Sequence, residues 1–200
     1  MKGENIMNER SVGSNMNLLF VGYAISLVVS ILDLLGVSGG IVSLASLAGL
    51  VIIMLALDRL KNYHPGYGKA FQYEIILIVF SVISVVVLIV AAFVPFLLWP
   101  VVLLMMVGSS VLNYLVVRYT SLSTADLAKD KGDMEAAALG VKVNQIYLIC
   151  AGVSVVCTIL SVIPLLGMIF SLLGKLASLA SIAGLALMVS FLYRVKLCLS

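Results

Sequence analysis

Six long apolar runs alternate with shorter polar segments along the chain. Each run is long enough to cross a hydrocarbon core of about 30 Å as a helix. We therefore predict an all-α membrane protein with six transmembrane helices. The expected spans are residues 17–35, 41–57, 73–94, 99–117, 144–163 and a last span that ends near Tyr193.

The connections between the runs alternate between tight and long. Residues 36–40 form a glycine-rich turn, residues 95–100 carry a proline at each end, and Pro164 and Gly167 end the fifth run. Tight turns of this kind join consecutive runs into helical hairpins, predicted at residues 17–57, 73–117 and 143–193. The remaining segments are a polar N-terminal tail at 1–16, polar cytoplasmic loops at 58–72 and 118–142, and a C-terminal tail at 194–200.

The longer polar loop contains two motifs that are typical of helix starts. One begins at Ser123 (Ser-Thr-Ala-Asp) and the other at Asp133 (Asp-Met-Glu-Ala). Two interpretations of residues 118–142 stay open, a short surface helix that contacts a partner or a solvated connector.

The chain contains an internal repeat. Residues 43–61 (SLASLAGLVIIMLALDRLK) and 178–196 (SLASIAGLALMVSFLYRVK) match at ten of nineteen positions without a gap. An arginine follows a glycine by ten residues in each predicted hairpin, which is about 15 Å of helix and places each glycine near the bilayer midplane. These glycines are Gly49, Gly108 and Gly184. We therefore predict three parallel copies of one helical hairpin.

The basic residues predict the orientation of the protein in the membrane. Eleven of the twelve Lys and Arg residues lie on the side of the tails and long loops. By the positive-inside rule this side is cytoplasmic, so both termini are expected there, in a cell (plasma or inner) membrane. Lys175 is the exception, and the repeat aligns it with Gly40 and Trp99 at the outer interface.

One acidic residue, Asp33, is expected on the same outer side as Lys175. Two interpretations of this pair stay open. An ion pair between Asp33 and Lys175 would fasten the first hairpin to the third. Two independently solvated interfacial charges are the alternative, since exposed ion pairs contribute little to stability.

Composition excludes several classes of protein. Hydrophobic residues make up 63% of the 200 residues, charged residues make up 10%, and the net charge is +3. An ordinary soluble domain is about half apolar and about a quarter charged. A soluble fold, a nucleic-acid-binding protein and a disordered chain are therefore poor interpretations, and the lipid bilayer is the expected partner.

Small residues recur at helical spacing within the apolar runs. Such residues let helix backbones approach closely, and their hydroxyl groups can form hydrogen bonds between helices. A polar pore lining is the alternative interpretation. Packing is favoured because no ionisable group accompanies the small residues at depth, Glu74 and Asn113 being expected near the cytoplasmic ends of their helices. The candidate packing residues are Gly22, Ser26, Ser30, Gly49, Gly108 and Gly184.

No assembled catalytic or metal-binding set stands out in the sequence. Residues 36–39 match the Gly-x-Ser-Gly nucleophile motif of rhomboid proteases through Ser38. The single histidine, His64, is expected on the opposite side of the membrane, so the nucleophile lacks a base. We therefore expect a protein without enzymatic activity, cofactor or metal ion.

Leu57-x-x-Leu60-x-x-Tyr63 is followed by Gly66-x-x-x-Ala70-Phe71, after a glycine-turn hairpin. Through this pattern, residues 36–80 resemble small multi-pass prokaryotic membrane proteins of unknown function, and the resemblance implies no activity. The sequence favours a membrane scaffold or subunit that packs against another membrane protein or a second copy. The alternative is a small-solute transporter or channel with a hydroxyl-lined path.

Overall fold

The structure, a computed structural model, describes residues 2–37, 39–93, 95–160 and 167–199. Within the helices, the side chains of residues 2–11, 91–92, 95–99, 167–175 and 177 lie outside that description. The described residues form six helices and no strand, and all six are long and apolar enough to cross a membrane. The prediction of an all-helical membrane protein is confirmed at this level. The helices are α1 (Lys2–Leu34), α2 (Gly40–Leu60), α3 (Pro65–Ala92), α4 (Pro95–Asp130), α5 (Met134–Leu160) and α6 (Gly167–Leu199).

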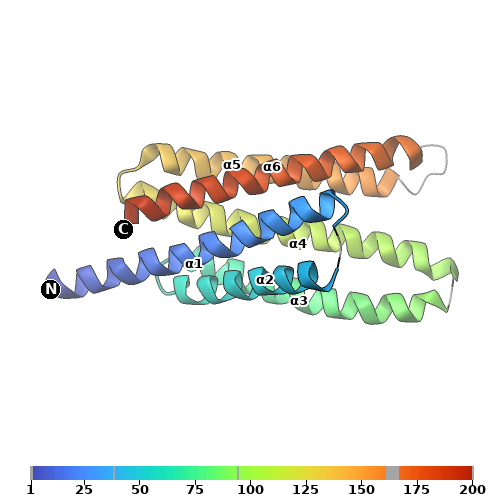
Figure 1. Cartoon of the computed structure of the whole chain (residues 1–200), viewed down its shortest axis with the longest axis horizontal. Helices are drawn as coiled ribbons and strands as arrows, with labels where there is room; N and C mark the ends of the chain where they lie inside the picture. The colour runs from blue at the N-terminus through green and yellow to red at the C-terminus, as the bar shows by residue number, and fades with distance from the viewer. Residues whose placement is uncertain (1, 38, 94, 161–166, 200) are drawn as a thin grey trace.

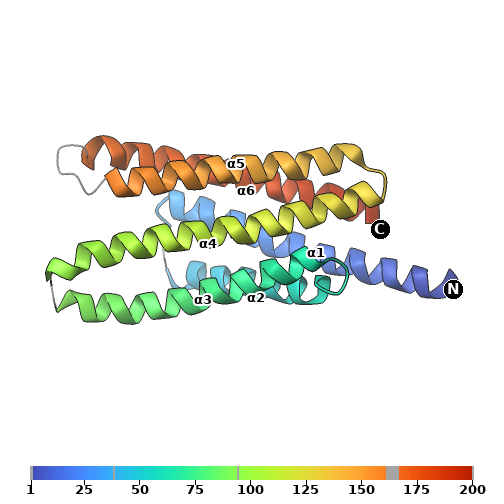
Figure 2. The same cartoon turned by 180° about the vertical axis from the view of Figure 1, so that it is seen from behind.

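The six helices are arranged as a ring. Each helix contacts the one that follows it, and α6 returns to contact α1. All of them run along the long axis of the molecule, and both termini lie toward the same end (Figures 1 and 2). The contact between α2 and α3 is the least extensive of the six. A ring of helices leaves a central space whose filling depends on the side chains that point inward.

The helices extend further than the apolar runs from which they were predicted. Most of the predicted loop at 118–142 is helical, because α4 continues to Asp130 and α5 begins at Met134. Ser123 is therefore inside α4, whereas the predicted helix start at Asp133 agrees with the start of α5. The loop at 58–72 is also mostly helical, since α3 begins at Pro65, where the fixed φ of proline suits a first helical position. Residues 2–16 of the predicted N-terminal tail belong to α1.

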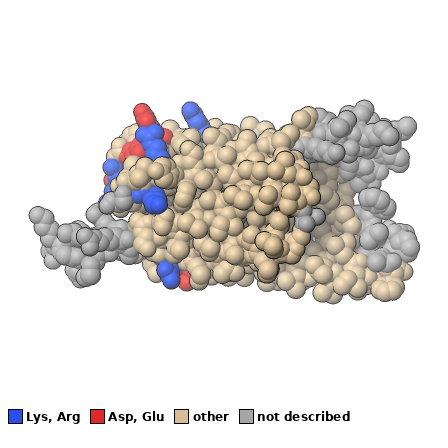
Figure 3. Space-filling view, viewed as in Figure 1, with Lys and Arg blue, Asp and Glu red and all other residues tan. Residues whose placement is uncertain are grey.

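These polar extensions are helical because they pack against one another at the end of the bundle where the termini lie. Small residues of α4 and α5 are buried there, among them Ala125, Ala128 and Ala136. Tyr67 of α3 is fully buried, and its hydroxyl group forms a 2.8 Å hydrogen bond with Thr124 of α4. Lys, Arg, Asp and Glu side chains gather on the surface at this end (Figure 3). We call it the charged end.

The side chain of Asp133 caps the start of α5 and also binds Arg194 near the end of α6. The carboxylate of Asp133 accepts a 2.9 Å hydrogen bond from the backbone N–H of Ala136, the bond expected of an N-cap residue. It also accepts hydrogen bonds of 3.2 and 3.3 Å from the guanidinium group of Arg194. The bond from Ala136 is the main reason that the pKa of Asp133 falls from 3.8 to about 2, with Cys198 and Arg194 adding to the effect.

This cap predicts a dependence of stability on pH. Because folding lowers the pKa of Asp133, its ionised form stabilises the fold above pH 3.8, and this stabilisation is lost as the pH falls through about 2. Asp133→Asn keeps a capping oxygen and removes the charge. We expect its unfolding temperature, followed by circular dichroism, to lie below that of the wild type at neutral pH and to converge with it near pH 2. Asp130→Asn, which removes a charge in the same connection without these bonds, is the control, and an equal effect of both variants would contradict the prediction.

Candidate functional site

A cavity of about 1180 Å³ occupies the centre of the ring. All six helices contribute to its wall. Its floor is formed by residues that also belong to the packed core of the charged end, namely Tyr23, Ile53, Val117 and Tyr147. Asp33 lines the cavity ten residues further along α1 than Tyr23, which is about 15 Å of helix. The cavity therefore extends from the packed core toward the opposite end of the bundle.

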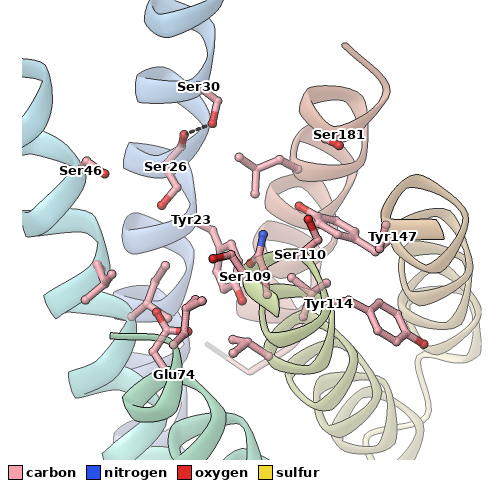
Figure 4. A pocket seen from close by; sticks show the side chains of 18 of the residues that line it. Tyr23, Ser26, Ser30, Ser46, Glu74, Ser109, Ser110, Tyr114, Tyr147 and Ser181 are labelled. Carbon is pink, nitrogen blue, oxygen red and sulfur yellow. Dashed lines mark hydrogen bonds between the residues drawn. The ribbon is translucent and has the colours of Figure 1, made fainter. Parts of the chain in front are cut away.

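The wall of this cavity carries many polar side chains among apolar ones, although the surrounding helices are apolar. Nine serines line it, together with Asn113, Glu74, Asp33 and three tyrosines. Figure 4 shows side chains from α1, α2, α3, α4 and α6 around the same space. A polar surface inside a membrane protein is costly unless it meets water or a ligand. The serines are Ser26, Ser30, Ser46, Ser81, Ser109, Ser110, Ser154, Ser178 and Ser181.

Several of these serines use their hydroxyl protons within their own helix. Ser26 donates to the carbonyl oxygen of Gly22 at 3.1 Å, and Ser30 donates to that of Ser26 at 2.9 Å (Figure 4). Ser81 and Ser110 donate in the same way, four residues back, at 2.8 Å. A hydroxyl group that donates to its own helix keeps its lone pairs available as acceptors. These four serines therefore offer the cavity acceptors rather than donors.

Glu74 is the one carboxyl group at the deep part of the cavity wall among the described residues. It comes from α3, is 6% exposed, and lies on the opposite side of the floor from the ring of Tyr147 (Figure 4). Within the described part of the chain, its carboxyl group forms no hydrogen bond and no ion pair. The sequence interpretation placed Glu74 near a helix end and gave it no role. Here it lines the same cavity as Ser26 and Ser30, at the inner end of that cavity, so an ionisable group does accompany these small residues.

The predicted packing glycines lie at contacts between consecutive helices. Gly22 of α1 and Gly49 of α2 face each other, and a Cβ added at Gly22 would lie 3.1 Å from the carbonyl oxygen of Gly49. A Cβ at Gly108 of α4 would lie 2.7 Å from the ring of Phe80 in α3, and one at Gly184 of α6 would lie 3.3 Å from the ring of Tyr147 in α5. Ser26 and Ser30, predicted with them, line the cavity instead.

Four other residues were candidates from the sequence, namely Asp33, Lys175, Ser38 and His64. Asp33 lines the cavity, but the side chain of Lys175 is outside the described part, so their pairing stays a prediction. Ser38 is outside it as well. His64 lies at the charged end, where its Nε2 atom is 3.6 Å from the carboxylate of Asp126. In the described part of the chain, no three His, Cys, Asp or Glu side chains are close enough to hold a metal ion.

A sequence signal for the polar lining existed and was missed. Glu74 and Ser81 are seven residues apart, which places them on the same face of one helix. Ser109, Ser110 and Asn113 are spaced by three and four residues and share a face of α4 in the same way. Glu74 is the second residue of the third apolar run, and this position alone indicates the end of a membrane span rather than a residue of a cavity wall.

Comparison with family models, curated proteins and solved structures found no match to this chain.

Proposed function

We propose that this protein is a transporter or channel for a small polar solute. The observation that carries the proposal is the serine-lined cavity, to which all six helices contribute and which contains the buried carboxyl group of Glu74. Substrate sites of membrane transporters lie near the bilayer midplane between repeated helical units. A cavity of about 1180 Å³ is large enough for a small organic solute with its bound water.

The scaffold role favoured by the sequence accounts for fewer of these features. Close packing at Gly22, Gly49, Gly108 and Gly184 is expected of a scaffold and of a transporter alike. A scaffold gains nothing from a polar space inside its own ring of helices, because burying unused polar groups costs free energy. The cavity therefore favours transport over the scaffold role.

The orientation of the protein is part of the proposal. Lys and Arg side chains gather at the charged end (Figure 3), among them Arg194, which pairs with Asp133 there, and the positive-inside rule assigns such an end to the cytoplasm. We propose that the cavity then opens away from the cytoplasm, because it extends from the packed core around Tyr23 and Tyr147 toward the opposite end of the bundle. An outward-open cavity with a packed inner end is one of the two states that alternating access requires.

Thiol labelling tests the cavity and the orientation together. Ser110→Cys places a thiol on the cavity wall, and Leu104→Cys places one on the exposed outer face of the same helix. Both are made after Cys150, Cys157 and Cys198 have been replaced by alanine. We expect a membrane-impermeant thiol reagent, added to intact cells, to label Ser110→Cys and to leave Leu104→Cys unlabelled, because a thiol in lipid does not ionise.

Gly39→Cys, in the turn between α1 and α2, reports the outer face in this experiment. Labelling of Gly39→Cys without Ser110→Cys would mean that the interior is packed, and it would overturn the proposal in favour of the scaffold. Labelling of both only in inside-out vesicles would reverse the orientation and keep the cavity. Flux of glycerol or of a cationic solute into liposomes that contain the protein would then establish transport, and empty liposomes give the background.

A further inference from the structure

The charge of the cavity indicates which solutes it accepts. Two carboxyl groups line it, Glu74 at the deep end and Asp33 ten residues along α1 from its floor, and the described wall contains no Lys, Arg or His. Glu74 is 6% exposed and has no hydrogen-bond or ion-pair partner within the described residues. A buried carboxylate without a partner is costly, and a bound cation offsets that cost. The cavity is therefore suited to a cation and opposes an anion.

The hydrogen-bonding groups narrow the class of cation further. The hydroxyl protons of Ser26, Ser30, Ser81 and Ser110 are donated to backbone carbonyl oxygens, so their oxygen atoms face the cavity as acceptors. A solute that carries N–H donors can satisfy such acceptors, whereas a quaternary ammonium ion has no N–H group to offer. This favours a primary amine over a quaternary one.

Two aromatic rings complete the deep end of the cavity. Tyr23 of α1 and Tyr147 of α5 are 4% and 8% exposed; Tyr23 lies on the Glu74 side of the floor, and Tyr147 lies on the opposite side (Figure 4). The face of an aromatic ring attracts a cation within about 6 Å of its centre. Rings of this kind beside a carboxylate are a common arrangement for binding an ammonium group.

The geometry points to a small protonated primary amine as the solute, with its ammonium group bound by Glu74 beside Tyr23. This inference rests on the proposed function and names the substrate class of the same cavity. Serine oxygen atoms higher on the wall accept hydrogen bonds from donor groups elsewhere on the solute. Asp33, at the other end of the cavity, attracts the cation toward the site.

Binding of ethanolamine, which is a protonated primary amine at neutral pH, tests the inference on the purified full chain. We expect saturating ethanolamine, at about a hundred times its Kd, to raise the unfolding temperature of the wild type by about 5 °C. Choline, a cation of related shape without N–H donors, should give a much smaller shift. Glu74→Gln keeps the size of the side chain and removes its charge, so it should lose the shift, and Glu74→Asp should recover part of it. Glu135→Gln, an exposed acid at the charged end, should respond as the wild type does.

Uptake into liposomes separates this inference from the proposed function. We expect Glu74→Gln to take up ethanolamine at least about tenfold more slowly than the wild type, since a charge-assisted hydrogen bond is lost. Glycerol uptake without an ethanolamine shift or uptake would overturn the amine inference and leave the transport proposal standing. Equal ethanolamine uptake or shift in Glu74→Gln, or a choline response as large as that to ethanolamine, would also overturn the inference. An unlabelled cavity cysteine together with no uptake of either solute would overturn both.

Discussion

Replacing Gly140 by alanine is expected to lower the free energy of unfolding by about 1–3 kcal/mol, the usual cost of overpacking. Gly140 lies where α5 crosses α4 and α6. An added Cβ would lie 2.7 Å from Cζ of Phe191, 2.8 Å from Cβ of Ala125 and 3.1 Å from the carbonyl oxygen of Ser121. The phenylalanine ring can turn aside, but Ala125 has no freedom to move except with its helix. Relief of the clash therefore requires α4 and α5 to separate.

The matched control is Gly152→Ala in the same helix. An added Cβ at Gly152 meets no atom within 4 Å. Alanine favours a helix over glycine by up to about 1 kcal/mol, so this variant should be as stable as the wild type or slightly more stable. Once Cys150, which lines the cavity, and the exposed Cys198 have been replaced by alanine in both variants, a maleimide dye that fluoresces on reaction with the buried thiol of Cys157 reports unfolding on heating in detergent. An unfolding temperature for Gly140→Ala equal to that of Gly152→Ala would contradict the packing described at this crossing.

The existence of six helices could be predicted from the sequence because a membrane span needs about 20 apolar residues and leaves a strong signal. The ends of the helices could not. Thr120, Ser121, Ser123 and Thr124 have the polar composition of a loop, yet all four are buried in α4 at the charged end. Their burial depends on α3, α5 and α6, which lie far away in sequence. A local pattern carries no information about such partners.

The cavity was the feature least accessible to sequence reasoning. A serine in an apolar helix has the same local pattern whether it packs against a neighbouring helix or lines a polar space. The distinction depends on which faces of the six helices turn toward the centre of the ring. For Ser26 and Ser30 the sequence favoured packing because no ionisable residue was expected beside them. In the structure, the carboxyl group of Glu74 lines the same cavity as these two serines.

The glycines were the better guide, because each of them lies at a close contact with another helix, Gly49 against α1 and Gly108 and Gly184 against the aromatic rings of Phe80 and Tyr147. Gly49, Gly108 and Gly184 were singled out by their equal spacing from an arginine, and each lies against the helix that precedes its own. The repeat of three hairpins remains a prediction.

Replacing Gly22 by leucine is expected to destabilise the protein by about 3 kcal/mol and to distort the cavity. A Cβ here would lie 2.6 Å from Cγ1 of Ile53, 3.0 Å from its backbone nitrogen and 3.1 Å from the carbonyl oxygen of Gly49. Two of these three atoms are backbone, so α1 and α2 must move apart. Tyr23 and Ile53 form part of the cavity floor, and their separation should therefore reduce the ethanolamine shift as well as the unfolding temperature. Gly152→Leu, whose added side chain starts in open space, is the control for size and hydrophobicity. A Gly22→Leu protein that unfolds at the same temperature as Gly152→Leu would mean that α1 and α2 do not cross at these glycines. Tyr23 and Ile53 would then not close the floor of the cavity together.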